Sequence, residues 1–506
     1  MEKTTAQRVR GSVVSMFIAR PISALGGLLV LIVLSRALPS SDYGLYFGLW
    51  ASAEILILAS NAGLLHAVYR YVSASERLDG RILPRGPVLP LLGWRIATLC
   101  LAALGAAVFP EVLTTLAGLP PLMSGVSTML AAIVFGEGLA RFIESIFDSM
   151  LSQGRSQATL VARTLFRLAG ILYFLEAGSL TLVEVVTVEV IAALGGAGLG
   201  LALLGQVYWH ANRVAGINEE QQSFRRMTKF AFPAFAAQIL GIAYGADVLK
   251  IVLTKTAGIE AVAIFGFAYS LAAVIRRYMP ANLFAGVFRP VFVAASKKAN
   301  GDEVLSGLFN LVIKINWLVI LPIFCLLAVA GAPLLSGLSG GKYGQSAEVM
   351  LILIGALLPL VIHLTLSMFC LARENSIYPL YSTVLAIMGL PIGIYLSAKY
   401  GAKGMSIALC VSEGIWAATC LFLLKWVSRE ALRLDWGGLA RMLAASVLAV
   451  MLGLALNRAG GSWYLVAPAT VLSCLLGVHF LSAFSKQEKA WLIDIMPFAR
   501  RVARVM

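Results

Sequence analysis

Apolar runs of about twenty residues recur along this chain from one end to the other. Of its 506 residues, 59% are hydrophobic and only 13% are charged, and the mean hydropathy is +0.87. A helix needs about twenty apolar residues to cross the roughly 30 Å hydrocarbon core of a bilayer, and soluble domains do not carry such runs repeatedly. The sequence therefore predicts one integral membrane domain built from helices.

Hydropathy along the chain predicts an all-α polytopic membrane protein with about 14 transmembrane helices. The predicted spans are 13–36, 44–68, 88–109, 123–149, 158–177, 183–208, 230–253, 260–295, 305–331, 347–371, 377–397, 403–425, 439–456 and 462–483. No small-residue cleavage site lies near the first apolar run, so we expect it to stay in the protein as a span.

Basic residues in the predicted loops set the orientation. With the N-terminus placed in the cytoplasm, the inner segments carry 24 Lys and Arg residues and the outer loops carry six. Cytoplasmic loops of membrane proteins are enriched in these residues. We therefore expect both termini to be cytoplasmic.

Sequence signals of enzymes, metal sites and nucleic-acid binding are missing. The six cysteines lie in apolar runs without CxxC spacing, and the four histidines are scattered, so neither a disulfide framework nor a metal site is indicated. No GxSxG motif or phosphate-binding Gly-rich motif occurs. The net charge of +15 forms no separate basic domain, so nucleic acid is not an expected partner. We expect a protein without catalytic residues, not an enzyme.

Charged residues form a stripe on the fourth predicted span. Glu137, Arg141 and Glu144 are spaced by four and three residues, which places them on one face of a helix. The fifth span folds back antiparallel, which brings Arg163 level with Glu144 and Arg167 near Arg141. We interpret these five residues as structural ion pairs between two adjacent helices; a role in ion coupling is the alternative.

A second group of cations inside the predicted spans requires partners from other helices or from water. The group is Arg20, Arg95, Lys250, Arg276, Arg277 and Lys314. Only Lys250 has an acidic residue one helical turn away, Asp247. Charges in a bilayer are costly and usually face a partner or a water-filled cavity. Several of these cations lie at similar depths, which predicts a shared cationic cavity for an anionic group; separate pairing of each cation is the alternative.

Prolines interrupt the spans that carry these cations. Pro21 follows Arg20, and Pro280 and Pro290 lie within the span 260–295. As one straight helix that span would be about 54 Å long, which exceeds the hydrocarbon core. We expect it to kink or to protrude into the cytoplasm.

Two segments six spans apart share a pattern. Residues 20–50 and 232–272 each have an early proline, a long apolar span, a basic residue at its outer end, and an acidic residue before an aromatic span. An offset of an even number of spans preserves direction through the membrane. The pattern indicates two parallel repeats.

Three segments of the chain resemble a known family. They are LSRALPSSDYGLYFGLWASAEILILASNAGLLHAVYRYVS (34–73), APLLSGLSGGKYGQSAEVMLIL (332–353) and YGAKGMSIALCVSEGIW (400–416). They resemble the bacterial polysaccharide flippases, the exporters of O-antigen and exopolysaccharide repeat units in the multidrug/oligosaccharidyl-lipid/polysaccharide (MOP) superfamily. The resemblance implies two pseudo-symmetric six-helix lobes around a central cavity, plus a C-terminal helix pair. The expected parts are an N-lobe (1–210), a cytoplasmic linker (211–229), a C-lobe (230–426), spans thirteen and fourteen (427–484) and a basic cytoplasmic tail (485–506).

The resemblance also implies a function. Such a protein flips an oligosaccharide linked to undecaprenyl pyrophosphate across the bacterial cytoplasmic (inner) membrane by alternating access, for lipopolysaccharide or exopolysaccharide biosynthesis. Carried over by position, the cavity charges of the family correspond to Arg20, Glu54, Asp247, Lys250, Arg276 and Arg277. Glu54 and Asp247 are the expected coupling residues for a proton or sodium gradient or the membrane potential, and no cofactor is expected.

Partners and alternative functions follow from the same resemblance. The expected partners are the lipid-linked oligosaccharide and membrane lipids, with a polysaccharide polymerase and glycosyltransferases as candidate protein partners. A peptidoglycan-precursor flippase and a multidrug/cation antiporter of the same superfamily are the alternatives. The antiporter should have an acidic, aromatic cavity, whereas the predicted cavity here is basic. A membrane glycan polymerase or ligase would need catalytic residues in large outer loops, and the predicted outer loops are short.

Overall fold

The structure is a computed structural model of the chain. It describes residues 2–68, 85–117, 119–120, 125–150, 152–212, 235, 239–283, 292, 301–373, 377–428, 432–485 and 488–489. Within these ranges the side chains of residues 2–18 and of Arg20, among others, are not described. The chain divides into two compact units, Met1–Ala263 and Ile264–Met506.

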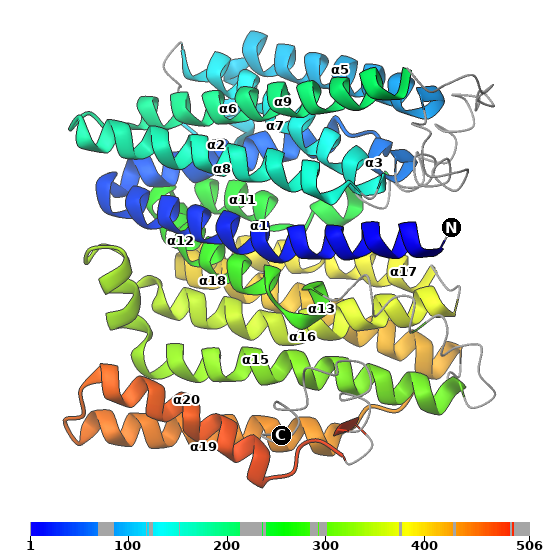
Figure 1. The fold of residues 1–506 in the computed structure, drawn as a ribbon. Helices are drawn as coiled ribbons and strands as arrows, with labels where there is room; N and C mark the ends of the chain where they lie inside the picture. The colour runs from blue at the N-terminus through cyan, green and yellow to red at the C-terminus, as the bar shows by residue number, and fades with distance from the viewer. Residues whose placement is uncertain are drawn as a thin grey trace. The chain divides into compact units, whose positions relative to one another are not determined.

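All regular elements in the described part of the first unit are helices (Figure 1). They are α1 (Glu2–Ala37), α2 (Ser40–Ala59), α3 (Leu64–Ala67), α5 (Arg85–Val108), α6 (Pro110–Ala117), α7 (Val126–Ser149), α8 (Gln153–Glu176), α9 (Leu182–Asn212), α11 (Ala246–Ala257) and the start of α12 (Ile259–Arg277).

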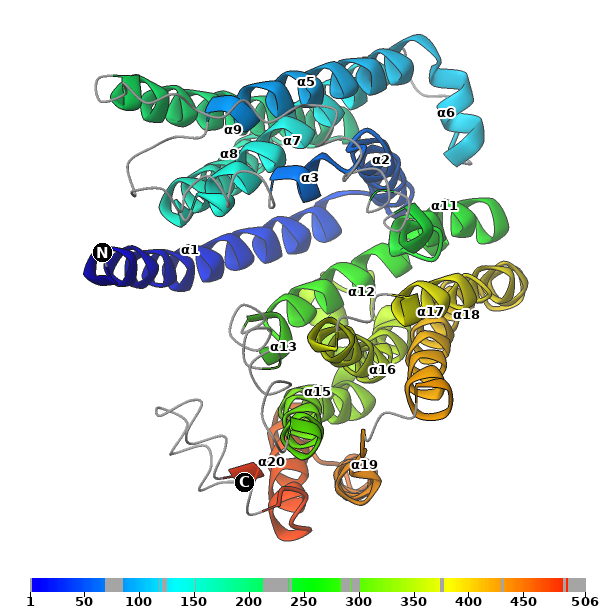
Figure 2. The same cartoon turned by 90° about the vertical axis from the view of Figure 1, so that its right-hand side faces the viewer.

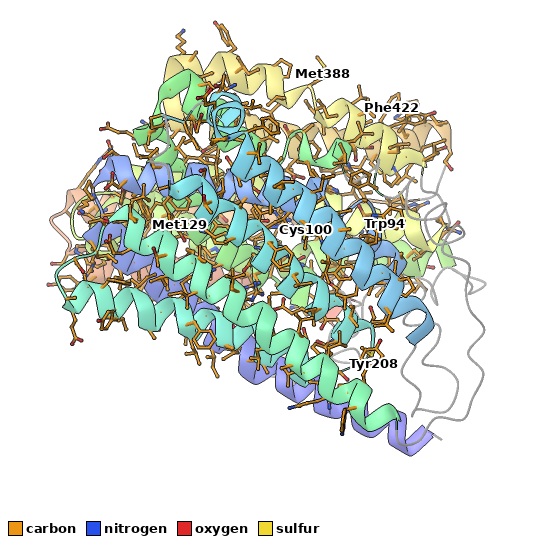
Figure 3. The ribbon with its side chains drawn as sticks, turned by 90° about the horizontal axis from the view of Figure 1, so that it is seen from above. Trp94, Cys100, Met129, Tyr208, Met388 and Phe422 are labelled. Atoms are coloured by element: carbon orange, nitrogen blue, oxygen red, sulfur yellow. The ribbon has the colours of Figure 1, made fainter. Side chains whose placement is uncertain are left out.

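Helix α7 lies at the centre of the first unit. It packs against α2, α5, α8 and α9, while α1 packs on α8 and α11 packs on α2. Its apolar positions Leu130, Val134, Ile143 and Phe147 are fully or almost fully buried in the core of this unit. Because α7 is enclosed by four other helices, the carboxylates of Glu137 and Glu144 on it are largely buried, at 5% and 16% exposed. Seen from above, the ribbons of α5 and α7 lie beside each other, and Cys100 on α5 is exposed (Figure 3).

The second unit is also helical throughout its described residues (Figure 2). After the end of α12 it contains α13 (Pro280–Leu283), α15 (Gly301–Leu338), α16 (Ser346–Ala372), α17 (Ile377–Ala386), α18 (Gly389–Phe422), the π-helical turn η2 (Leu423–Val427), α19 (Trp436–Arg458) and α20 (Trp463–Phe480). Helix α15 packs against α16, α19 and α20, and α18 packs against α16 and α17. Helix α15 therefore connects the C-terminal pair α19–α20 to the rest of the unit.

Helix α18 contains a reversal of chain direction at Gly401. That residue has φ 57° and ψ −133° inside an otherwise helical segment, a conformation that is strained for a residue with a Cβ atom. On either side the chain packs on itself: a Cβ atom added at Gly393 would lie 3.0 Å from Cβ of Ala408, and one at Gly389 would lie 3.2 Å from the Ala408 carbonyl oxygen. The segment is a helical hairpin, so it supplies two of the predicted spans.

The helices agree with the spans expected from hydropathy, and the all-α polytopic membrane fold is confirmed. In the described part of the chain, ten segments are long and apolar enough to cross a membrane, and one of them, Ile377–Val427, contains the hairpin. Each of the fourteen predicted spans overlaps a helix. The second span is broken at 60–63, where Ala62 and Gly63 have positive φ angles. The predicted linker at 211–229 lies almost entirely outside the described residues, so the lobe boundaries remain a prediction.

Helix α12 ends inside the predicted eighth span. Helix α12 stops at Arg277, a turn follows, and α13 begins at Pro280. Proline has no N–H and cannot continue the hydrogen-bond pattern of a preceding helix without a break. The expected interruption of this long span is therefore present, and Pro290 lies outside the described residues.

Large apolar side chains cover much of the outer surface of the helices. On α19, for example, the side chains of Val447, Leu448 and Met451 are exposed. A soluble protein avoids large apolar patches of this kind. Lipid is the solvent that matches this surface.

Candidate functional site

The first unit contains a network of charged side chains that begins between α2 and α7. The guanidinium of Arg141 donates two hydrogen bonds to Glu54, from Nη1 to Oε2 at 2.7 Å and from Nη2 to Oε1 at 2.6 Å. Its Nε donates to Oε1 of Glu137, one turn earlier on α7, at 2.8 Å. A bidentate contact of this kind is the strongest geometry for an arginine–carboxylate pair. Glu54, which was predicted as a coupling residue, is therefore paired with Arg141, which was predicted to belong to the structural ion pairs.

Arg163 on α8 continues the network. Its Nη2 lies 2.6 Å from Oε1 of Glu144, and its Nη1 also pairs with Glu137. The Arg163 side chain is only 6% exposed. The Glu144–Arg163 contact predicted from the sequence is present, and Arg163 lies between two carboxylates rather than beside one.

Arg167 pairs with a helix that the sequence interpretation did not consider. Its Nε lies 2.6 Å from Oε2 of Glu189 on α9, and its guanidinium lies 5.5 Å from the ring centroid of Trp50. The other carboxylate oxygen of Glu189 accepts a hydrogen bond of 2.9 Å from the hydroxyl of Tyr46. Tyr46 and Trp50 are one turn apart on α2, so Arg167 and Glu189 connect α2, α8 and α9.

A small pocket lies beside the Arg167–Glu189 pair. Tyr46, Trp50 and Glu189 line it together with apolar residues of α2, α7 and α9. It has space for about one water molecule. A pocket of this size is suited to water or a small ion and is far too small for a sugar.

Arg95 does not contact any of these acids. It lies on α5, is 3% exposed, and donates to the carbonyl oxygen of Ile57 at 3.1 Å and to Oγ of Ser60 at 3.2 Å. Both acceptors are at the C-terminal end of α2, where the last carbonyls of a helix lack helical partners. Arg95 thus caps α2, in place of the cavity-lining position that its depth in the third span suggested.

Lys250 and Asp247 are paired within α11, as their spacing predicted. The Nζ–Oδ1 distance is 2.8 Å, and the Lys250 side chain is 9% exposed while that of Asp247 is 28% exposed. The ammonium also lies 5.9 Å from the ring centroid of Phe47 on α2. The carboxylate of Asp247 therefore already has a cation beside it.

Lys314 is the clearest departure from the predicted cavity. Its side chain is fully buried on α15, and Nζ lies 2.6 Å from Oδ2 of Asp435 and 2.8 Å from Oε2 of Glu488. Asp435 is the N-cap of α19, where Oδ1 accepts the N–H of Gly438 at 2.9 Å. Burial raises the pKa of Asp435, but the hydrogen bonds from Lys314 and Gly438 outweigh burial and leave that pKa below its usual range. Lys314 is a buried ion-pair residue and does not face a water-filled cavity.

Arg276 and Arg277 have a different environment from the other cations. They form the end of α12, and both side chains are exposed. Within the described part of the chain, no ion pair to either residue is recorded. Nδ2 of Asn282 donates to the Arg276 carbonyl oxygen at 2.7 Å, which caps the helix end. Arg20 lies inside α1, but its side chain is outside the described residues.

Comparison with known proteins identifies the family of this chain. A family described as polysaccharide biosynthesis protein matches residues 9–296, more than half of the sequence. The chain belongs to this family. A search of curated protein sequences found no significant match.

Solved structures of the MOP superfamily share the fold of this polysaccharide biosynthesis family member. The lipid II flippase MurJ in an inward closed conformation superposes with a TM-score of 0.70 at 13% identity, covering 95% of this chain and 99% of the other. An inward-facing MATE family multidrug resistance transporter gives 0.61 at 13% identity, covering 83% and 98%. A MOP transporter from Pyrococcus furiosus, reported to have a binding pocket of reverse polarity, gives 0.51 at 13%, covering 84% and 96%. The chain therefore shares its fold with a lipid II flippase and with multidrug transporters.

Proposed function

We propose that this protein flips an oligosaccharide linked to undecaprenyl pyrophosphate across the bacterial inner membrane, for lipopolysaccharide or exopolysaccharide biosynthesis. The observation that carries the proposal is the pair of exposed arginines at the end of α12. Arg276 and Arg277 are adjacent, exposed and without a recorded ion pair in the described residues. The family match to polysaccharide biosynthesis supports the saccharide, and the fold shared with a lipid II flippase supports a lipid-linked substrate.

The chemistry of a pyrophosphate fits two neighbouring guanidinium groups. Each guanidinium offers a planar fork of N–H donors that matches phosphate oxygens two at a time. The other described cations of the predicted site already have carboxylate or carbonyl partners, so an anionic ligand would have to displace those partners. Arg276 and Arg277 carry no such cost. Arg20, in the first unit, remains a separately proposed substrate contact.

Transport would proceed by alternating access, without making or breaking a covalent bond. The sugar would cross through a polar cavity while the polyprenyl chain stays in lipid. A polymerase and glycosyltransferases would be the protein partners that use and supply the substrate. Both termini are proposed to be cytoplasmic, since the basic residues are concentrated in the segments on that side.

The coupling proposed for Glu54 and Asp247 requires these carboxylates to exchange partners. Glu54 is held by two hydrogen bonds from Arg141, and Asp247 is held by Lys250. A proton or a sodium ion would therefore enter either site only in a conformation in which Arg141 or Lys250 has moved away.

The experiment is replacement of both arginines of α12. Arg276→Ala with Arg277→Ala should weaken binding of a purified undecaprenyl-pyrophosphate saccharide about a hundredfold or more, because each of the two charge-assisted contacts contributes roughly 1.5–3 kcal/mol. Export should be lost in a complemented deletion strain while the amount of protein in the membrane stays normal. Replacement of both by Lys should keep part of the activity, because a point charge lacks the bidentate fork.

Arg458 provides the matched control. It is also an exposed arginine in the last turn of a helix, α19, so Arg458→Ala removes the same favourable contact with the helix C-terminus. That variant should bind and export normally. Wild-type binding and export by the double variant would disprove the anion site. Binding of organic cations with no binding of the lipid pyrophosphate would favour the antiporter alternative.

A further inference from the structure

A histidine and a glutamate are paired inside the membrane-spanning part of the second unit. Nδ1 of His363 on α16 lies 2.8 Å from Oε2 of Glu413 on the second half of the α18 hairpin. The two side chains are 19% and 11% exposed. Each residue is nine positions before the last residue of its helix, about 14 Å along the axis, so both lie well within the hydrocarbon core.

The surrounding side chains hold the imidazole ring in place. The ring of His363 stacks on Trp416, with 3.6 Å between centroids and 21° between planes. Trp416 is 1% exposed, and its Nε1 donates to Oγ1 of Thr383 on α17 at 3.0 Å. Helices α16, α17 and α18 thus all contribute to the site. No partner is recorded in the described residues for Nε2 of His363, which leaves one ring nitrogen for a proton.

No other formal charge on the described neighbouring helices compensates this pair. On α15, the level opposite His363 is set by the Trp317 hydrogen bond to the Leu358 carbonyl and by the Phe309–Phe369 contact. The charged residue of α15 at this level is Lys314, whose ammonium is engaged by Asp435 and Glu488.

The remaining titratable groups on the elements that pack here are weak acids. They are Tyr378 and Tyr381 on α17, Cys370 on α16, Cys325 on α15, and Tyr395, Tyr400, Cys410 and Cys420 on α18, whereas α13 carries none. The charged residues of these helices lie far along the chain from the pair, at helix ends or beside the turn at Gly401: Asp302, Glu303, Glu348, Lys399 and Lys403. His363 and Glu413 are therefore the ionisable pair at this level of the described helices.

We propose that His363 and Glu413 form a proton-binding site through which the second unit couples transport to the proton gradient. One proton is gained and lost in each cycle. Without it, a neutral imidazole faces a carboxylate and the site carries one negative charge. With it, an imidazolium faces the carboxylate and the site is neutral. An intramembrane ionisable pair with a compensated and an uncompensated state is what a proton relay requires.

Proton uptake changes the electrostatic energy of the His363–Glu413 pair. A single negative charge in a low-dielectric interior is costly, and the imidazolium that forms on proton uptake offsets part of that cost by its attraction to the carboxylate 2.8 Å away. The states of the transport cycle that hydrate this site favour release of the proton, and the states that close it favour retention. The proposal goes beyond Glu54 and Asp247, which are already paired with cations, and its coupling part depends on the proposed transport function.

Trp416 supplies a direct test of proton binding that does not require transport. An imidazolium stacked on an indole quenches its fluorescence more than a neutral imidazole does. The contribution of Trp416 is the difference in fluorescence emission between the wild type and Trp416→Phe, both as purified full-length protein in lipid nanodiscs. This difference should increase as pH rises through the range in which histidine titrates, about pH 5–8. This step should be absent in His363→Gln.

Glu413→Gln is the second variant, since it keeps the size of the side chain. The step should persist but occur at a different pH from that of the wild type, because the imidazolium loses its neighbouring negative charge. His479→Gln, which removes an exposed histidine in the last turn of α20, should leave the step unchanged. A pH-independent Trp416 emission in the wild type, or the same step in His363→Gln, would disprove the proton site.

The coupling part is tested in proteoliposomes with a fluorescent undecaprenyl-pyrophosphate saccharide. An imposed pH gradient should accelerate flipping by the wild type and by His479→Gln, and should have no effect on His363→Gln. Equal acceleration in His363→Gln would disprove the coupling. A Trp416 step in a protein that flips no lipid-linked saccharide would instead contradict the proposed substrate and leave the proton site intact.

Discussion

The cations inside the membrane-spanning region differ in the groups that they contact. Arg141, Arg163 and Arg167 contact carboxylates from neighbouring helices, and Arg95 contacts the carbonyl end of a helix. Contacts within one helix follow from spacing, as in the Lys250–Asp247 pair. Contacts between helices depend on how the helices rotate about their axes, which spacing does not determine. The position of each cation along its span was therefore predictable from the sequence, but most of the partners were not.

Arg163 should contribute more to stability than Glu144. Replacement by Gln removes the guanidinium that lies between Glu137 and Glu144, and breaking a buried ion pair costs about 3–5 kcal/mol. In Glu144→Gln, by contrast, Arg163 keeps Glu137 as its partner. Thermal unfolding of the detergent-solubilised variants should show a larger loss for Arg163→Gln than for Glu144→Gln.

Arg155→Gln is the control, because Arg155 is exposed at the start of the same helix. An exchange of the charges, Glu144→Arg with Arg163→Glu, should fail to restore stability. The new glutamate at position 163 would face Glu137, which is a contact that the predicted two-residue pair did not include. Stable single variants that lose transport would show that these charges serve function rather than packing.

At the scale of helices, one glycine and one proline explain where helices end. Hydropathy separated residues 377–397 from 403–425, and that boundary is present in the structure, because α18 reverses direction at Gly401 between them. It also treated 260–295 as one span, although the helix stops before Pro280. Hydropathy records how apolar a segment is, whereas reversal of direction depends on one backbone conformation at one residue.

Gly401 should tolerate no side chain. Its φ of 57° with ψ of −133° costs about 1–3 kcal/mol for a residue with a Cβ atom, so Gly401→Ala should lower the unfolding temperature of the purified protein. Gly414→Ala is the control, since Gly414 is helical on the same element and an added Cβ meets nothing within 4 Å. Equal stability of the two variants would show that the hairpin turn adapts to a side chain.

For the whole molecule, composition was sufficient for the fold class and insufficient for the site. The number of spans and the helical class follow from the length and polarity of the apolar runs, because the bilayer imposes both. The His363–Glu413 pair could not be found in this way, since its residues are 50 positions apart. An isolated histidine in one span and an isolated glutamate in another were the available signals.

Orientation is a prediction for the intact cell. In a variant without the six native cysteines, a cysteine introduced near Glu111 or Lys342 should react with an impermeant thiol reagent in intact cells. One introduced near Arg81 or Lys297 should react only after the inner face is opened. The reverse pattern would place the N-terminus outside and would invert the proposed direction of transport.

The burial of Lys314 has a consequence for the order of synthesis. Its carboxylate partners follow 121 and 174 residues later in the chain, and at about 5–20 residues per second the ribosome needs roughly 10–35 seconds to reach the second. Helix α15 is therefore synthesised before its ammonium group has a partner. The rest of the helix is strongly apolar, with a mean hydropathy of 2.6 in its most apolar segment, and this offsets the cost of inserting one charge. A chain that ended before Asp435 would lack both carboxylate partners of Lys314. Completion of the C-terminal part thus supplies the negative charges that compensate the ninth span.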